Sequence, residues 1–338
     1  MRDERNFIAT NLNLGVSVVV PVFNSACTLH KLVGEIELQL KSIHCDFEVI
    51  LVNDGSMDLT SSVLNEIVMS KDFVTVLELS RNYGQHNALL CGIRQARKPV
   101  IVTLDDDLQN PPSEIWKLLL KLKDGYDVVY GVPQKESHGL MRDLASLTTK
   151  LVLQKAMGAD IATSISTFRA FRTDLRDAFA EYKSPFVCID ILLTWATSRF
   201  GAVKVQHSAR TSGASNYTLG KLVTHATNLV TGFSVIPLQF ASMSGFVLLC
   251  IGLGGALYVV LNYLLNGGKN VPGFAFLACA ILIFSAAQLL ALGIIGEYLA
   301  RMYTRTMGKP VYMVRSTRPA EVLYDNSTID VDRCGSNV

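Results

Sequence analysis

Short apolar runs rich in β-branched residues alternate with helix-length segments over the first 210 residues. Runs of 4 to 8 residues of this kind predict buried strands. The expected strands are Val16–Phe23, Phe47–Val52, Val74–Leu79 and Val100–Leu104. Alternation of strands with helices predicts an α/β fold in which helices cover both faces of a mainly parallel sheet. Ligands of such sheets bind at the carboxyl ends of the strands.

Two long apolar segments follow this alternating region. Met243–Leu265 and Phe274–Ile295 are 23 and 22 residues long, each close to the ~20 residues that cross a bilayer as a helix. The breaker-rich connection 266–272 between them predicts a two-helix transmembrane hairpin. Four basic residues follow the second segment, at 301, 305, 309 and 315, while only Lys269 occupies the connection. The positive-inside bias therefore predicts that both long ends lie in the cytosol.

An amphipathic segment precedes the first apolar segment. Apolar residues between Leu219 and Phe233 recur at helical spacing, and Lys221, Thr224, His225 and Asn228 lie on the opposite side. This pattern is typical of a juxtamembrane helix that lies at the membrane interface, although packing on the soluble domain is the alternative.

Composition and charge narrow the class of protein. Of the residues, 49% are hydrophobic and 18% are charged, against about 25% charged in soluble proteins, so a membrane-associated part is expected. The 31 basic and 29 acidic residues nearly cancel, which gives no case for a nucleic-acid partner. The seven cysteines form no Cys-x-x-Cys pair, which excludes disulfide scaffolds and zinc ribbons.

Acidic residues follow two of the expected strands. Asn53-Asp54-Gly-Ser ends the second strand, and Asp105-Asp106-Asp107 ends the fourth. Three adjacent carboxylates repel one another unless a cation lies among them. Oxygen ligands favour a hard divalent ion, so the run predicts a Mg²⁺ or Mn²⁺ site that bridges a diphosphate. The sequence has no Gly-x-Gly-x-x-Gly and no Walker-type loop, which disfavours a dehydrogenase or a P-loop kinase.

Seven stretches together resemble one enzyme family. They are Val18–Asn24, Val52–Ser56, Arg81–His86, Thr103–Pro112, Gly125–Val129, Ser212–Tyr217 and Gly296–Tyr298. In combination they resemble glycosyltransferase family 2, the inverting nucleotide-sugar transferases of the GT-A fold, and more narrowly its polyprenyl-phosphate glycosyltransferases. The resemblance extends from the first strand to just past the second apolar segment, and its motifs are specific only in combination.

The resemblance implies a set of site residues. Pro21, Asn24, Asp54 and Asp105 match positions that bind the nucleotide sugar, with Asp54 accepting a hydrogen bond from the base. Asp105 and Asp107 match the acids of the metal-binding DxD motif, Asp107 being the expected direct ligand.

The resemblance also implies an acceptor site. Arg210, Ser215 and Lys221 match positions that receive the lipid phosphate in relatives. Arg and Lys next to an interfacial helix suit a phosphate monoester held at headgroup level. The implied partners are therefore a nucleotide-diphosphate sugar, a polyprenyl phosphate and a membrane, with a homo-oligomer, in relatives a tetramer, as a further implication.

Several positions depart from the pattern of the family. Asn24 stands where many relatives have Glu, Asn53 replaces an Asp, and Asp106 fills a position that is usually Ala. The acids that relatives place before Phe-Arg are replaced in Thr163-Ser-Ile-Ser-Thr-Phe-Arg169. Asp190 is the nearest substitute for a general base. The simpler interpretation is that Asp190 is an ordinary residue at the start of a helix.

The expected reaction does not require that base. A phosphate monoester has a second pKa near 6, so the acceptor is largely a nucleophilic dianion at pH 7. The expected function is inverting transfer of a sugar, from a UDP-linked donor, to a polyprenyl phosphate on the cytosolic face of the inner (plasma) membrane. Such a product donates sugar to a cell-envelope glycan or to lipopolysaccharide. A polysaccharide synthase acting on a sugar hydroxyl, or a catalytically inactive scaffold, remains as an alternative.

The expected domain boundaries follow from these patterns. They are an N-terminal arm at 1–15, a cytosolic GT-A domain at 16–215, an amphipathic helix at 216–240, two transmembrane helices at 241–298, and a cytosolic basic segment and tail at 299–338.

Overall fold

We describe the protein from a computed structural model. It describes residues 15–133, 165–184, 186–207, 236–265 and 274–318. The chain forms two compact units, the first comprising 1–217 with 310–338 and the second comprising 218–309. Residues 310–318 thus belong with the first unit.

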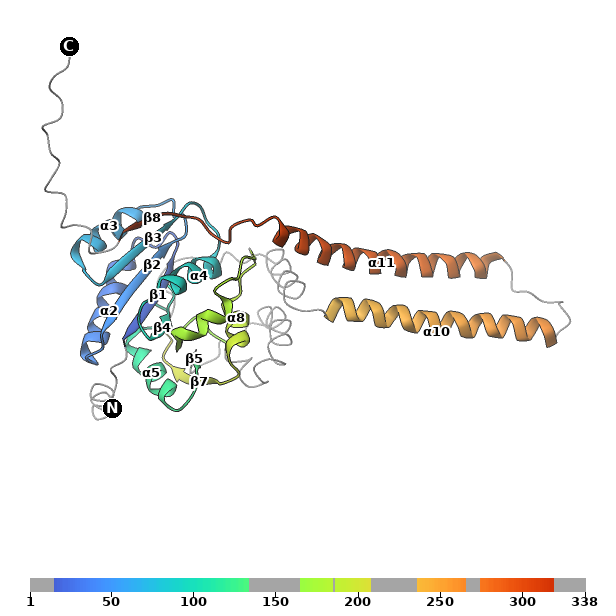
Figure 1. Cartoon of the computed structure of the whole chain (residues 1–338), viewed down its shortest axis with the longest axis horizontal. Coiled ribbons are helices and arrows are strands. Elements are labelled where there is room, and N and C mark those ends of the chain that lie inside the picture. Colours follow the sequence, from blue (N-terminus) through green and yellow to red (C-terminus); the bar gives the residue numbers. More distant parts are fainter. Residues whose placement is uncertain (1–14, 134–164, 185, 208–235, 266–273, 319–338) are drawn as a thin grey trace, which may run out of the picture. The chain divides into compact units, whose positions relative to one another are not determined.

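An eight-stranded sheet forms the centre of the first unit (Figure 1). The strands are β1 (Val16–Val22), β2 (Phe47–Asn53), β3 (Val74–Leu79), β4 (Val100–Thr103), β5 (Val128–Pro133), β6 (Arg169–Arg172), β7 (Phe200–Val205) and β8 (Val314–Arg318). Their spatial order is β7-β5-β6-β4-β1-β2-β3-β8. The predicted mainly parallel sheet is confirmed: β4, β1, β2 and β3 are mutually parallel and β5 is parallel to β7, whereas β6 and β8 pair antiparallel with their neighbours.

Helices connect these strands. They are α2 (Leu29–Ser42), α3 (Thr60–Ser70), α4 (Gln85–Gln95), α5 (Ile115–Lys123) and α8 (Ile189–Ala196), with 3₁₀ turns η1 (Pro112–Glu114) and η2 (Thr173–Phe179). Pro112 begins η1, a position that suits proline because it lacks the N–H that a first turn leaves unpaired.

Both faces of strand β1 are buried, which explains its unbroken apolar run. All seven residues of β1 are buried. The even-numbered valines, from Val16 to Val22, lie in one core cluster with side chains of α2, α3 and α5. Val19 points to the other face, where α4 packs so closely that a Cβ added to Gly92 would lie 2.4 Å from Val19 Cγ1. Glycine at this position therefore sets how near α4 lies to the sheet.

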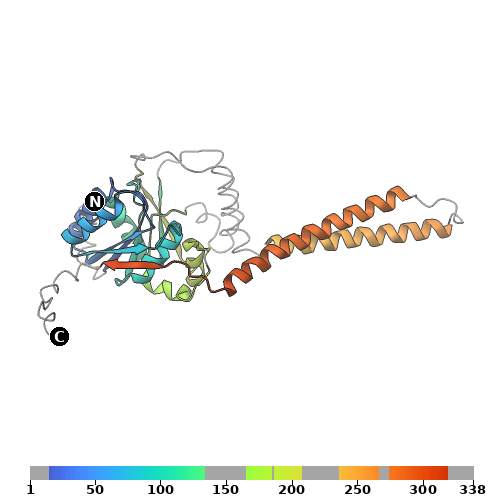
Figure 2. The ribbon, with the colours of Figure 1, turned by 90° about the horizontal axis from the view of Figure 1, so that it is seen from above.

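Strand β8 was not predicted. Val314–Arg318 pairs antiparallel with β3 and forms the edge of the sheet (Figure 2). The segment before it is held as well, since Tyr312 Oη accepts a hydrogen bond from Arg94 Nη1 of α4 at 3.3 Å. A polar strand such as Val-Arg-Ser-Thr-Arg carries no alternation of hydrophobic residues that would have identified it.

The second unit contains two helices that pack side by side in opposite directions (Figures 1 and 2). They are α10 (Ile236–Leu265) and α11 (Phe274–Thr306). Gly252 of α10 faces Phe284 of α11, and an added Cβ would lie 3.1 Å from the ring. The two apolar segments are thus helical, but the membrane-spanning part of the prediction is not confirmed. Taken over the described residues, neither helix reaches the length and apolar composition that crossing a bilayer demands.

Candidate active site

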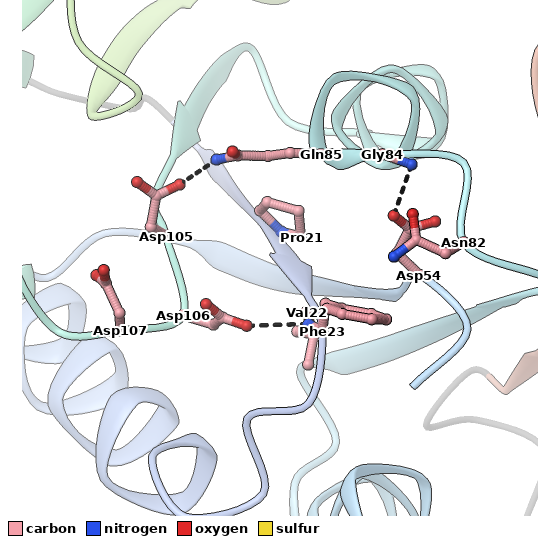
Figure 3. Close-up of a pocket in the computed structure, with 10 residues that line it drawn as sticks. All are labelled: Pro21, Val22, Phe23, Asp54, Asn82, Gly84, Gln85, Asp105, Asp106 and Asp107. Carbon is pink, nitrogen blue, oxygen red and sulfur yellow. Dashed lines mark hydrogen bonds between the residues drawn. The ribbon is translucent and has the colours of Figure 1, made fainter. Parts of the chain in front are cut away.

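A pocket of about 280 Å³ opens where several strands of the parallel sheet end at their carboxyl termini. Its walls come from the end of β1, the loops that follow β2 and β4, and the start of α4 (Figure 3). The lining residues are Pro21, Val22, Phe23, Asp54, Asn82, Gly84, Gln85, Asp105, Asp106 and Asp107. The predicted site residues Pro21, Asp54, Asp105 and Asp107 are therefore brought together, as the position of ligand sites in such sheets requires.

Asp54 holds the loop that leads into α4. Its two carboxylate oxygens accept the backbone N–H groups of Tyr83 and Gly84 at 2.7 and 2.8 Å. The side chain is only 3% exposed, and burial raises the pKa of Asp54 although the two N–H donors oppose the shift. Gly84 adopts φ 94°, a left-handed conformation that favours glycine. Asp54 therefore fixes one wall of the pocket.

Asn24 has a different position from the one expected. It does not line the pocket. Its side-chain oxygen accepts the N–H of Met57 at 2.9 Å, and its own N–H donates to Ser56 Oγ at 3.0 Å. Asn24 has φ 53°, which asparagine tolerates better than most residues. It therefore joins the loop after β1 to the loop after β2.

Of the three consecutive acids, Asp105 and Asp107 point to the same side and Asp106 turns away from them (Figure 3). Asp106 turns toward the loop after β1, where it accepts the N–H of Phe23 at 3.0 Å and the hydroxyl of Ser25. Asp105 accepts Gln85 Nε2 at 2.6 Å and the hydroxyl of Thr167. Asp107 accepts the N–H of Gln109 at 3.1 Å. Asp106 thus anchors the Phe23 wall of the pocket, a role that an Ala at this position would not perform.

The acids fit a hard divalent cation. Burial, together with the neighbouring carboxylates of Asp107 and Asp106, raises the pKa of Asp105 to about 6. A cation between Asp105 and Asp107 would relieve that repulsion, and carboxylate oxygens are the ligands that Mg²⁺ and Mn²⁺ prefer. Asp105 and Asp107 are therefore the residues that would hold such an ion.

Asp190 does not line the pocket. It lies in the first turn of α8, 6% exposed, and its Oδ1 forms an ion pair with Arg169 and accepts Tyr130 Oη at 3.0 Å. Arg169 is fully buried, and its Nε donates to Thr103 Oγ1 at 3.2 Å. A carboxylate that balances a buried guanidinium is poorly placed to act as a general base.

The other predicted residues, Arg210, Ser215 and Lys221, lie outside the described residues, as does most of the expected amphipathic helix at 216–240 and the arm at 1–14. Sequence reasoning assigned no role to Gln85 and Thr167, which contact Asp105, or to Arg169, which pairs with Asp190. Gln85 lies in the Arg81–His86 stretch, and Thr167 lies in the stretch where relatives have acids. The sequence therefore indicated the region of each residue but not its contact with Asp105.

Asp54→Asn is expected to lower the free energy of unfolding by about 1–3 kcal/mol, because the new amide presents an N–H donor to one of two backbone N–H groups. Chemical denaturation measures the difference. The exposed Asp72 provides the matched control, and Asp72→Asn should leave the unfolding transition unchanged. Equal effects of both substitutions would refute the assigned role of Asp54.

Comparisons with known proteins agree with this geometry. The family model described as "Glycosyl transferase family 2" matches residues 17–179. Proteins named undecaprenyl-phosphate 4-deoxy-4-formamido-L-arabinose transferase match over nearly the whole chain. The one from Yersinia pestis (strain Pestoides F) is 32% identical over 317 residues, 93% of this chain and 97% of that protein. The one from Pectobacterium carotovorum is 34% identical over 305 residues, 89% and 93% of the two chains.

Solved structures show the same fold. Mannosyl-3-phosphoglycerate synthase from Rubrobacter xylanophilus matches with a TM-score of 0.51 and 16% identity, over 67% of this chain and 74% of that one. Glucosyl-3-phosphoglycerate synthase from Mycobacterium tuberculosis, solved with Mn²⁺, UDP-glucose and phosphoglyceric acid, also has a TM-score of 0.51 and 16% identity, over 68% and 82%. The first unit therefore has a GT-A-like fold. With relatives above 30% identity over nearly its full length, the chain belongs to glycosyl transferase family 2, and those relatives are named as undecaprenyl-phosphate sugar transferases.

Proposed function

We propose that the protein transfers a sugar, with inversion, from a nucleotide-diphosphate sugar to a polyprenyl phosphate. The observation that carries the proposal is that Asp54 and the acid pair Asp105 and Asp107 line the same pocket. At this edge of the sheet, Asp54 would contact the base of the nucleotide. A cation held by Asp105 and Asp107 would bind the diphosphate. The names of the relatives support the lipid phosphate as the acceptor.

The donor half of the proposal is a UDP-linked sugar with Mg²⁺ or Mn²⁺. A solved synthase of the same fold binds UDP-glucose and Mn²⁺. Here Asp54, Asp105 and Pro21 would contact the nucleotide sugar, with Asn24 supporting the loop beside them. When bound, the cation would neutralise charge on the departing diphosphate oxygens.

The acceptor phosphate attacks the sugar without the help of a general base. One oxygen of the phosphate dianion attacks the anomeric carbon, the bond from that carbon to the diphosphate oxygen breaks, and the nucleoside diphosphate leaves with the electron pair. No proton moves in this step, because the dianion already carries its nucleophilic lone pair at pH 7. The position of Asp190 beside Arg169 supports this unaided attack. Arg210, Ser215 and Lys221 would hold the phosphate.

We also propose that the reaction takes place at the cytosolic face of the inner membrane, on a multi-pass protein. The support is the sequence, in which the stretches 222–268 and 270–296 contain no Asp, Glu, Lys or Arg. A polyprenyl acceptor lies in the bilayer, so its phosphate is presented at headgroup level. The product would supply sugar for cell-envelope glycan or lipopolysaccharide modification.

A panel of radiolabelled nucleotide sugars, each supplied with undecaprenyl phosphate in membranes, tests the proposed function. One donor should give a labelled lipid that releases its sugar in mild acid and requires Mg²⁺ or Mn²⁺. Label that appears in a glycan chain without a phosphate-linked lipid would favour a polysaccharide synthase instead. Absence of label with every donor, from folded protein, would favour a scaffold.

Arg210→Ala is expected to raise the KM for polyprenyl phosphate by ~10-fold or more and to leave the KM for the sugar nucleotide nearly unchanged. The reason is the loss of a charge-assisted contact to the acceptor phosphate, which contributes roughly 1.5–3 kcal/mol. Initial-rate kinetics with each substrate varied in turn measure the two constants. Lys204→Ala, at an exposed position of β7, is the control. Equal rises in both KM values would contradict the assignment.

A further inference from the structure

Three side chains with metal-binding atoms meet between α4 and α8, apart from the pocket. His86 lies in the first turn of α4, Cys188 directly precedes α8, and Asp190 lies in the first turn of α8. One ligand atom from each lies within 4.8 Å of the others. Cys188 and Asp190 are buried and His86 is half-buried, so the cluster is screened from bulk water.

The surroundings of the cluster already orient its carboxylate. Both hydrogen-bonding partners of the Asp190 side chain, Arg169 and Tyr130, contact Oδ1, which leaves Oδ2 without a donor among the described residues. Carboxylates that bind metals are commonly held in this way by an outer ring of hydrogen bonds. The positive charge of Arg169 is balanced by Asp190, so Cys188 as a thiolate would balance one of the two positive charges of a divalent cation.

A nitrogen of His86 also lies next to the start of α8. His86 Nδ1 accepts the N–H of Ile189 at 3.4 Å, which is longer than the 2.7–3.2 Å of an ordinary N–H hydrogen bond. A cation that took this lone pair would replace that hydrogen bond. One nitrogen, one sulfur and one oxygen are the ligand types of zinc, and three protein ligands leave a fourth position for water.

We propose that His86, Cys188 and Asp190 form a binding site for a Zn²⁺-class transition metal, separate from the hard-cation site at Asp105 and Asp107. The ligand types distinguish the two sites. Carboxylate oxygens alone favour Mg²⁺ or Mn²⁺, whereas a thiolate and an imidazole favour Zn²⁺ or Co²⁺. Binding converts the Cys188 thiol to a thiolate, so one proton is released for each ion bound.

The site also connects to the pocket through the chain. His86 directly follows Gln85, whose amide donates to Asp105 at 2.6 Å. An ion that fixes His86 would therefore hold the first turn of α4, which forms part of the pocket wall. This link does not depend on which sugar or acceptor the enzyme uses.

Titration of the purified full-length protein with Co²⁺ tests the site. One equivalent should give a thiolate-to-cobalt charge-transfer band in the near ultraviolet. The band should persist in saturating Mg²⁺ and disappear when Zn²⁺, which binds such ligands more tightly, is added. The band should be lost in Cys188→Ser and in His86→Gln. It should remain in the matched controls Cys27→Ser and His30→Gln, whose side chains are exposed.

Two results would overturn the proposal. The first is the absence of a band from the unaltered protein. The second is a band that survives Cys188→Ser or His86→Gln in folded protein, which would place the cobalt elsewhere. Far-UV circular dichroism of each variant shows whether it is folded, and because two ligands are replaced separately, misfolding of one leaves the other as a valid test. Loss of sugar transfer has no bearing on the outcome, since the band reports binding alone.

Discussion

Asp107→Asn is expected to lower turnover on the order of 10²-fold or more while the protein stays folded. The substitution removes one of two carboxylates that would hold a divalent cation against the leaving diphosphate, and charge stabilisation of this kind contributes several kcal/mol to a transition state. The carboxylate of Asp107 is half-buried and accepts the N–H of Gln109, two residues along the chain. Turnover at saturating substrates measures the effect.

Asp124→Asn provides the matched control for this result. Asp124 forms an exposed ion pair with Lys121 after α5, away from the pocket, and its loss should leave turnover unchanged. Added Mn²⁺ should restore part of the activity of Asp107→Asn, because excess cation compensates for weaker binding. Full activity of the unaltered enzyme in excess EDTA would show that no cation is needed.

Asp190→Asn is expected to lower the free energy of unfolding by about 3–5 kcal/mol, which is the usual effect of removing one partner of a buried ion pair. The Arg169 guanidinium is fully buried and has Asp190 as its only ion-pair partner among the described residues. One of its nitrogens, Nη2, already lacks a hydrogen-bond partner within that part of the chain. Thermal or chemical unfolding, compared with Glu181→Gln at an exposed pair, measures the loss.

The same variant distinguishes a structural role of Asp190 from a catalytic one. If the acceptor dianion attacks unaided, the residual rate should rise with pH through the second phosphate pKa near 6 and then level off, in the variant as in the unaltered enzyme. If Asp190 is the base, turnover should fall by ~10²-fold or more in protein that remains folded. That outcome would overturn the role assigned here.

The sequence predicted the central strands of the sheet because a strand that is buried on both faces consists mainly of apolar residues. Strands β1 to β4 are short, mainly apolar runs, and each coincides with an expected strand to within one residue. Strands β5, β6, β7 and β8 were not among the expected strands. Arg169–Arg172 begins and ends with arginine, and its first residue is buried only because Asp190, 21 positions along the chain, balances its charge. A pairing of that kind has no local signal.

The candidate site was predicted in part for a related reason. Asp54, Asp105 and Asp107 follow strands directly, so their convergence at one edge of a parallel sheet can be inferred. Gln85 and Thr167 contact Asp105 from a helix start and from an irregular segment, and their distance in space does not follow from their spacing in the sequence. Asn24 was assigned to the pocket by resemblance, but its left-handed backbone directs the side chain to Met57.

Strand β8 makes the catalytic unit discontinuous along the chain. The second unit, 218–309, is inserted between the main body of the first unit and its last strand, so two covalent connections join the units. A protein shortened at residue 217 would lose β8 and expose the backbone edge of β3, where unpaired N–H and C=O groups promote aggregation. A soluble catalytic fragment should therefore keep 310–318, rejoined to residue 217 by a flexible linker in place of the two helices.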